Sequence, residues 1–227
     1  PQGAIGMFRK CIAALGFIGF TSLAAAQSAQ EYMVTITNIT PGQTFTPQFV
    51  ATHASNFSMF SLGAPASESL EIMAEGGDTG PLMADVAGLA TDVLTIDGLL
   101  GPGETTSTVV TGVPGRDFIS IAGMLIPTND TFFALNRLRL PEDRPALLFV
   151  PGYDAGTEVN DQSCASIPGP RCGGEGFSPD PGEGFVHIGN GFHDLGDTND
   201  NGAEVLGPEV YDWRNWVARI VVRRLSR

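Results

Sequence analysis

Short runs of apolar and β-branched residues recur along the chain and are separated by segments rich in Gly and Pro. The runs cover residues 32–39, 45–53, 93–96, 104–111, 118–125, 131–140, 146–150 and 217–222. Runs of this length and composition are typical of strands, and Gly and Pro mark the turns between them. About eight strands at such short spacing predict an all-β fold, an antiparallel β-sandwich.

Two short segments, residues 66–75 and 82–89, have a helical pattern instead. Ser67 is in position to cap the first helix, and Gly76 and Gly77 follow its last turn. Charged residues make up 16% of the chain, which contains 29 Gly and 16 Pro. This composition excludes a helical bundle or a coiled coil, which needs many Glu, Lys, Ala and Leu.

Residues 1–26 have the pattern of an export signal and the residues just upstream of one. Arg9 and Lys10 precede an apolar run over residues 11–20, and small residues at 22–26 follow it. A basic segment, a short apolar run and small residues at the cleavage site are typical of signal peptides. We therefore expect one domain over residues 27–227, secreted or periplasmic, with no membrane insertion of the mature chain.

The charge of the chain limits its partners. The formal net charge is −13, whereas a protein that binds nucleic acid needs a basic face to neutralise phosphates. Nucleic acid is therefore excluded as a partner. Residues 151–207 form a long acidic segment rich in Gly, Pro, Asp and Asn. A loop of this length inside a compact domain is usually functional.

Cys164 and Cys172 lie eight residues apart in that loop. In an oxidising compartment such a pair forms a local disulfide, which we expect here. The alternatives are two free thiols or half of a metal site, but a zinc site needs closer pairs and more ligands.

Two loop segments beside predicted strands carry oxygen donors. Asp130 belongs to one, and Asp154, Glu158, Asn160 and Asp161 belong to the other. Ca²⁺ binds six to eight oxygen atoms from carboxylates, amides and carbonyls, so a sandwich that brings these loops together predicts a calcium site. The alternative is a set of Asx-turns at a solvated edge.

A second calcium candidate is the loop that contains Asp197, Asn199, Asn201 and Gly202. It matches the start of an EF-hand loop, but Pro208 occupies the position of the expected bidentate Glu. His187 and His193, beside Asp194, raise a different alternative, an exported hydrolase. Their spacing fits no zinc motif, and we interpret them as histidines hydrogen-bonded within loops.

Several segments resemble the spondin domain, the N-terminal module of F-spondin and mindin, in a bacterial secreted form. They are VTITNITPGQTFTP at residues 34–47, VATH at 50–53, GAPASE at 63–68, PTNDTF at 127–132 and YDAGTE at 153–158. The resemblance implies a C2-like sandwich that binds Ca²⁺ at one end. In the animal family this module serves cell adhesion and attachment to the extracellular matrix.

The resemblance also implies a ligand set. The family's S-P-D-W aspartate corresponds to Asp130, and its D-A-G-T-D motif to Asp154 and Glu158. Thr131 replaces the family's aromatic residue, and Glu158 replaces an aspartate. We therefore expect a non-catalytic calcium-binding recognition module whose partner is an extracellular protein or glycan. The alternatives are the hydrolase and a purely structural envelope protein.

Overall fold

The computed structural model describes residue 3, residues 28–192 and residues 196–225. The expected signal segment, residues 1–26, and His193 with Asp194 lie outside the described residues, apart from residue 3. The described residues form ten strands: β1 Gln30–Asn38, β2 Thr44–Phe45, β3 Gln48–His53, β4 Ala90–Ile96, β5 Thr105–Gly112, β6 Phe118–Ile126, β7 Thr131–Arg139, β8 Ala146–Asp154, β9 His187–Ile188 and β10 Trp216–Arg224. The helices are α1 Glu68–Gly76, α2 Gly80–Val86 and α3 Pro208–Tyr211.

The strands form an antiparallel sheet in the order β4-β3-β6-β7-β8-β10-β1-β5. β2 and β9, two residues each, pair with β6 and β8 outside this path. The two end strands approach each other, since Asp92 on β4 accepts a hydrogen bond from the Thr111 backbone N–H on β5 at 2.7 Å. The sheet is thus nearly closed into a barrel-like sandwich, and the predicted all-β fold of about eight main strands is confirmed.

The burial of each strand follows from what covers its two faces. β1 alternates buried and partly exposed residues, because one face lines the interior and the other faces solvent. β3 is buried throughout, and β6 is buried except at Phe118. Their inner face packs with Tyr32 and Ile220 in the interior, whereas their outer face packs under Leu70 of α1 and Leu82 of α2. The helices therefore explain the continuous apolar run of β6.

The first helix begins and ends as the sequence predicts. The Ser67 side chain accepts a hydrogen bond from the Leu70 backbone N–H, and Gly77 follows in the left-handed conformation with φ 75°. These contacts satisfy backbone groups that a helix leaves free at its ends. The short helix is thereby fixed over the outer face of the sheet.

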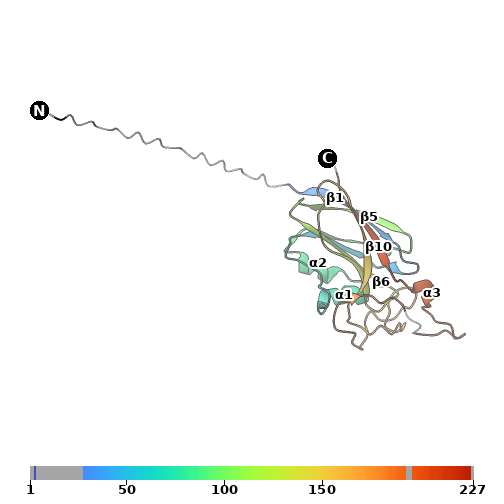
Figure 1. Cartoon of the computed structure of the whole chain (residues 1–227). Coiled ribbons are helices and arrows are strands. Elements are labelled where there is room, and N and C mark those ends of the chain that lie inside the picture. The colour runs from blue at the N-terminus through green and yellow to red at the C-terminus, as the bar shows by residue number, and fades with distance from the viewer. Residues whose placement is uncertain (1–2, 4–27, 193–195, 226–227) are drawn as a thin grey trace.

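The long loops lie together at one end of the sandwich, near α1 and α3, and the start of β1, which pairs with the end of β10, lies at the other end (Figure 1). The predicted disulfide is confirmed: Cys164 and Cys172 are joined, and Ile167 between them is buried in the core. Among the described residues, no helix has the length and apolar character required to cross a membrane.

Candidate metal centre

Two neighbouring strands bring two of the predicted ligands, Asp130 and Asp154, together at the loop end. Asp130 immediately precedes β7, and Asp154 is the last residue of β8. The strands are antiparallel and Thr131 pairs with Asp154, so the start of β7 meets the end of β8. The backbone N–H of Ala155 also donates to the Asp130 carbonyl at 3.2 Å. The pairing of the two strands thus places both carboxylates at one site.

The turn after β8 wraps around the Asp130 carboxylate. Asp130 Oδ2 accepts hydrogen bonds from the Thr157 backbone N–H at 2.8 Å, from Thr157 Oγ1 at 3.2 Å and from the Glu158 backbone N–H at 3.2 Å. Asp154 Oδ1 accepts from the Gly156 N–H at 2.8 Å. These bonds fix Asp130 and Asp154 and determine where the Glu158 side chain begins.

Gly156 makes this turn possible. Its φ is +68°, and a Cβ placed on it would lie 2.3 Å from the Phe185 carbonyl oxygen. A glycine avoids both the left-handed strain and the collision. The Gly184 backbone N–H then donates to the Gly156 carbonyl at 2.8 Å, so residues 182–185 lie directly against the turn.

Three carboxylate oxygens in this centre have no hydrogen-bond partner. They are Asp130 Oδ1 and both oxygens of Glu158, all fully buried. Asp130, Asp154 and Glu158 are at most 1% exposed as whole residues. In the part of the chain that the structure describes, no arginine side chain lies within 4 Å of these three carboxylates. Buried anions without partners are strongly unfavourable unless a cation or a proton neutralises them.

Among the described residues, however, Asp130, Asp154 and Glu158 do not form a group whose carboxylate oxygens all lie within 4.8 Å of one another. Asp154 repels Asp130, whereas the acids that act on Glu158 are Glu75 and Asp161. Asp130 and Asp154 therefore form an oxygen-donor pair that fits a cation, and the Glu158 carboxylate is not part of that pair.

The pKa values reflect this crowding. Burial raises the pKa of Asp130 to about 8, and repulsion by Asp154 adds to the rise. Burial and the neighbouring Glu75 raise the pKa of Glu158 to about 7. The Ser178 N–H and the Asn129 side chain lie close enough to oppose this rise, but neither forms a hydrogen bond of normal geometry with the Glu158 carboxylate. Burial raises the pKa of Asp154 too, against hydrogen bonds from Asn160 and Gly156.

Asn160 and Asp161, the two less favoured ligand candidates, form hydrogen bonds with residues of the centre and its neighbours. Asn160 Nδ2 donates to Asp154 Oδ2 at 2.8 Å. Asp161 Oδ1 accepts from Asn129 Nδ2 at 3.3 Å and from the Ser163 N–H at 2.8 Å. Both side chains therefore hold neighbouring residues in place.

Glu75, at the end of α1, is a buried acid of this region that the sequence analysis did not identify, because nothing in the sequence of its helix indicates that it lies near Glu158.

The second calcium candidate is a solvent-exposed turn. Asp197 Oδ2 accepts from the Cys164 N–H at 2.7 Å, and Asn199 Oδ1 accepts from the Asn201 and Ala203 N–H groups at 2.9 and 3.2 Å. Asp197, Asn199 and Asn201 are all exposed. These bonds use side-chain oxygens that a cation would need, so calcium binding there stays a prediction.

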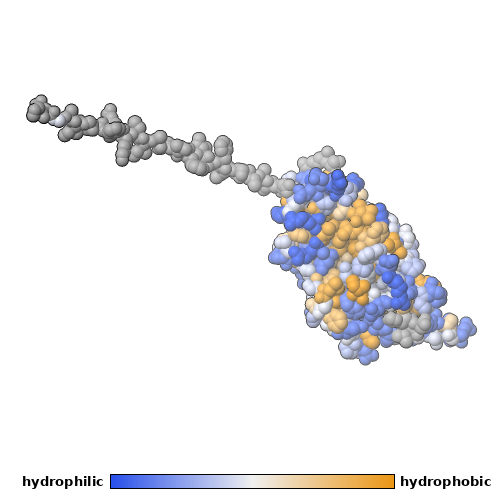
Figure 2. Space-filling model, viewed as in Figure 1, coloured by the Kyte–Doolittle hydropathy of each residue, from blue (hydrophilic) through white to orange (hydrophobic). Residues whose placement is uncertain are grey.

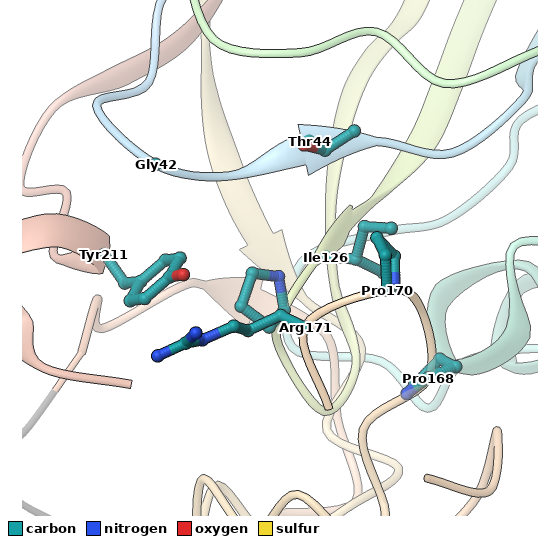
Figure 3. Close-up of a pocket in the computed structure, with 8 residues that line it drawn as sticks. Gly42, Thr44, Ile126, Pro168, Pro170, Arg171 and Tyr211 are labelled. Carbon is teal, nitrogen blue, oxygen red and sulfur yellow. The ribbon is translucent and has the colours of Figure 1, made fainter. Parts of the chain in front are cut away.

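A pocket near the loop end is separate from this centre (Figure 3). Its lining includes Gly42, Ile126, Pro168, Arg171 and Tyr211. None of the predicted ligands lines it. Arg171 lies in the disulfide loop, where its Nη2 donates to the Val205 carbonyl at 2.7 Å. The pocket therefore does not belong to the acidic centre.

The fold and the centre define a class: an acidic, disulfide-linked β-sandwich with buried carboxylates at one end. The family model described as Spondin_N matches residues 24–161, which include the whole Asp130–Asp154–Glu158 centre. The chain belongs to the spondin N-terminal domain family. This membership indicates a module of the extracellular recognition and adhesion type. No curated protein matches the chain.

Proposed function

We propose that this protein is a secreted, non-catalytic recognition module whose loop end is ordered by Ca²⁺. The observation that carries the proposal is the set of buried, unpartnered oxygens on Asp130 and Glu158. Calcium binds hard oxygen ligands and tolerates irregular geometry. Asp130, Asp154 and Glu158 are the residues that would hold it, with Glu158 turning toward the two aspartates on binding. The positive charge would remove the repulsion between Asp130 and Asp154.

Calcium would act by fixing loops. The turn at residues 154–158 touches both the start of β7 and residues 182–185, so neutralising its carboxylates stabilises several segments at once. An ion that binds the folded state and not the unfolded chain raises stability by mass action. The same ordering would set the surface that the loops present to a partner.

A groove beside the centre is a suitable recognition surface. β7 and β8 pair at Thr131–Phe133 and Gly152–Asp154 and separate beyond these residues. Phe60, Leu62, Phe149, Tyr153 and Trp216 line the space between them. Figure 2 shows apolar surface over the part of the molecule where Figure 1 labels β10. Exposed aromatic and aliphatic groups grouped in this way are typical of binding sites. The partner would be an extracellular protein or glycan.

Thermal unfolding with and without calcium tests the ion. Excess Ca²⁺ is expected to raise the Tm by several degrees over the same protein in EDTA, as binding to the native state requires. Asp154→Ala is expected to remove the difference, whereas Glu175→Gln, an exposed acid of the same loop region, is expected to keep it. Identical melting curves for the wild type in Ca²⁺ and EDTA would overturn the calcium site.

A binding screen tests recognition. The protein is applied to arrays of glycans and matrix proteins in Ca²⁺ and in EDTA, and calcium-dependent capture is expected. Trp216→Ala should weaken a captured ligand, whereas Leu99→Ala, an equally exposed apolar residue in the β4–β5 loop, should not. Capture that depends neither on Ca²⁺ nor on the Trp216 side chain would contradict this function.

A further inference from the structure

A second cluster of potential metal ligands lies on the other side of Asp154. Among residues 28–192 and 196–225, Asp154, Glu183 and His187 form the one group of His, Cys, Asp or Glu with candidate ligand atoms all within 4.8 Å of one another. His187 Nε2 lies 3.5 Å from Asp154 Oδ1 and 3.7 Å from Glu183 Oε2. Asp154 is shared with the calcium centre, but Asp130 and Glu158 are not members.

The backbone holds these three residues in place. His187 is paired with Asp154 in the β8–β9 ladder, so their side chains are direct cross-strand neighbours. Glu183 precedes His187 by four residues. It lies in the loop that the Gly184–Gly156 hydrogen bond holds against the turn at residues 154–158. Asn160 and Gly156 hold the Asp154 carboxylate. Such fixed supporting bonds are characteristic of metal ligands.

The hydrogen bond of His187 Nδ1 determines which ring nitrogen carries the proton. Nδ1 lies 2.8 Å from the Ile188 carbonyl oxygen, which can only accept a hydrogen bond. Nδ1 therefore carries a proton, and in the neutral ring Nε2 has a lone pair. That lone pair faces two carboxylates, and the Nε2 atom is buried with no hydrogen-bond partner. A lone pair that faces two carboxylates is unfavourable unless a proton on Nε2 or a metal cation lies between them.

The distances identify what fits between these atoms. Separations of 3.5 and 3.7 Å are too long for good hydrogen bonds. Nitrogen and oxygen ligands at about 2.0–2.2 Å from a tetrahedral zinc ion lie about 3.3–3.6 Å from each other. The two distances from His187 are therefore close to those between ligands of one small ion, and the Asp154 and Glu183 oxygens lie within 4.8 Å of each other.

We propose that Asp154, Glu183 and His187 bind a divalent transition-metal ion, and zinc is the ion used in the proposed experiment. Imidazole nitrogen suits zinc and its neighbours, whereas Ca²⁺ and Mg²⁺ select oxygen. Three protein ligands leave a fourth position of a tetrahedral ion for water. Glu183 is partly exposed, so that position is on the solvent side of the site.

Zinc titration of the purified protein without a polyhistidine tag tests the proposal. The experiment is made at pH 7.5 both without added Ca²⁺ and in saturating Ca²⁺, because Asp154 belongs to both sites, with a chromophoric chelator as competitor. The wild type is expected to bind one equivalent of Zn²⁺. His187→Ala and His187→Gln are expected to weaken binding on the order of 100-fold, and Glu183→Gln on the order of 10-fold, while Glu175→Gln leaves it unchanged.

Two further measurements separate the alternatives. Co²⁺ in place of Zn²⁺ should give the intense visible bands of a tetrahedral ion, lost in His187→Ala. Glu158→Gln should retain Zn²⁺ binding even where it loses the response to Ca²⁺, so failure of one site does not imply failure of the other. A wild type that binds no Zn²⁺, with NMR evidence for a doubly protonated His187, would overturn the proposal. Undiminished binding in both His187 variants would overturn it equally.

Discussion

The Glu158 backbone N–H donates to Asp130 Oδ2 at 3.2 Å, while the Glu158 carboxylate itself has no hydrogen-bond partner. One residue thus stabilises a neighbouring anion through its backbone and adds a second buried anion through its side chain. The turn that fixes Asp130 also brings Glu158 into the same region. The turn therefore buries two anions before any ion binds, at a cost in stability that an ion can offset.

Replacing Glu158 by glutamine is expected to stabilise the calcium-free protein. The pKa of Glu158 is raised to about 7, so its ionised form at pH 8 is unfavourable. A buried amide without partners costs less than a buried carboxylate. We expect Glu158→Gln to raise the free energy of unfolding in EDTA by about 1–2 kcal/mol and to reduce the stabilisation by Ca²⁺. Urea unfolding in both buffers measures this, with Glu175→Gln as the control. A less stable variant in EDTA would contradict the role of Glu158.

The stability of the calcium-free protein is expected to fall as pH rises from 5 to 8. The pKa values of Asp130 and Glu158 are about 8 and about 7 in the folded protein, above the ordinary values of the unfolded chain. The folded state therefore binds more protons in this range, and raising the pH removes stability until both groups are ionised.

Calcium is expected to flatten this pH profile, because the bound ion favours the ionised carboxylates. Urea midpoints at pH 5, 6, 7 and 8, in Ca²⁺ and in EDTA, measure the effect. Burial lowers the pKa of His53, so this histidine contributes the opposite slope between pH 5 and 7 in both buffers, and the difference between buffers is the informative quantity. Equal slopes in Ca²⁺ and EDTA would contradict the prediction.

Removing the disulfide is expected to destabilise the protein by about 2–3 kcal/mol, the loop-closure contribution of a cross-link between residues eight apart. The bond closes a loop whose Ile167 is buried in the core. The variant is Cys164→Ser with Cys172→Ser, compared with the wild type by urea unfolding under non-reducing conditions. Equal stability would mean that packing of Ile167 alone fixes the loop.

Most of the fold follows from local patterns in the sequence. The alternation in β1 and the continuous apolar run of β6 predict strands with one and two covered faces. Ser67 and Gly77 predict the ends of α1. The two-residue strands β2 and β9 lack such a pattern, because strand pairing with β6 and β8 defines them rather than their own residues.

The candidate site was partly predictable. Asp130 and Asp154 lie beside predicted strands, so an antiparallel sheet brings them together. The sequence leaves Glu183 and Glu75 unmarked, because one comes from an irregular loop and the other from a helix packed on the outer face. Their places near the centre depend on tertiary packing, such as the contact of Gly156 with Phe185, which has no local signal.

Replacing Gly156 by alanine is expected to damage the centre beyond the usual cost of losing a glycine. Gly156 and Gly103 have similar φ values, +68° and +75°. A Cβ at Gly156 would lie 2.3 Å from the Phe185 carbonyl oxygen, whereas a Cβ at Gly103 meets nothing within 4 Å. Gly103→Ala should therefore lower the free energy of unfolding by about 1–2 kcal/mol, because of its left-handed backbone alone. Gly156→Ala should cost about 1–3 kcal/mol more, because backbone atoms must move apart.

The same pair of variants separates stability from metal binding. Gly103 lies in the β4–β5 loop and none of the metal candidates does, so Gly103→Ala should keep the full response of the Tm to Ca²⁺. Gly156→Ala should weaken that response, since residues 154–158 carry the hydrogen bonds that orient Asp130 and Asp154. Thermal unfolding of both variants in Ca²⁺ and EDTA provides the comparison. Equal losses of stability and equal calcium responses in the two variants would mean that the close approach of Gly156 to Phe185 does not position the ligands.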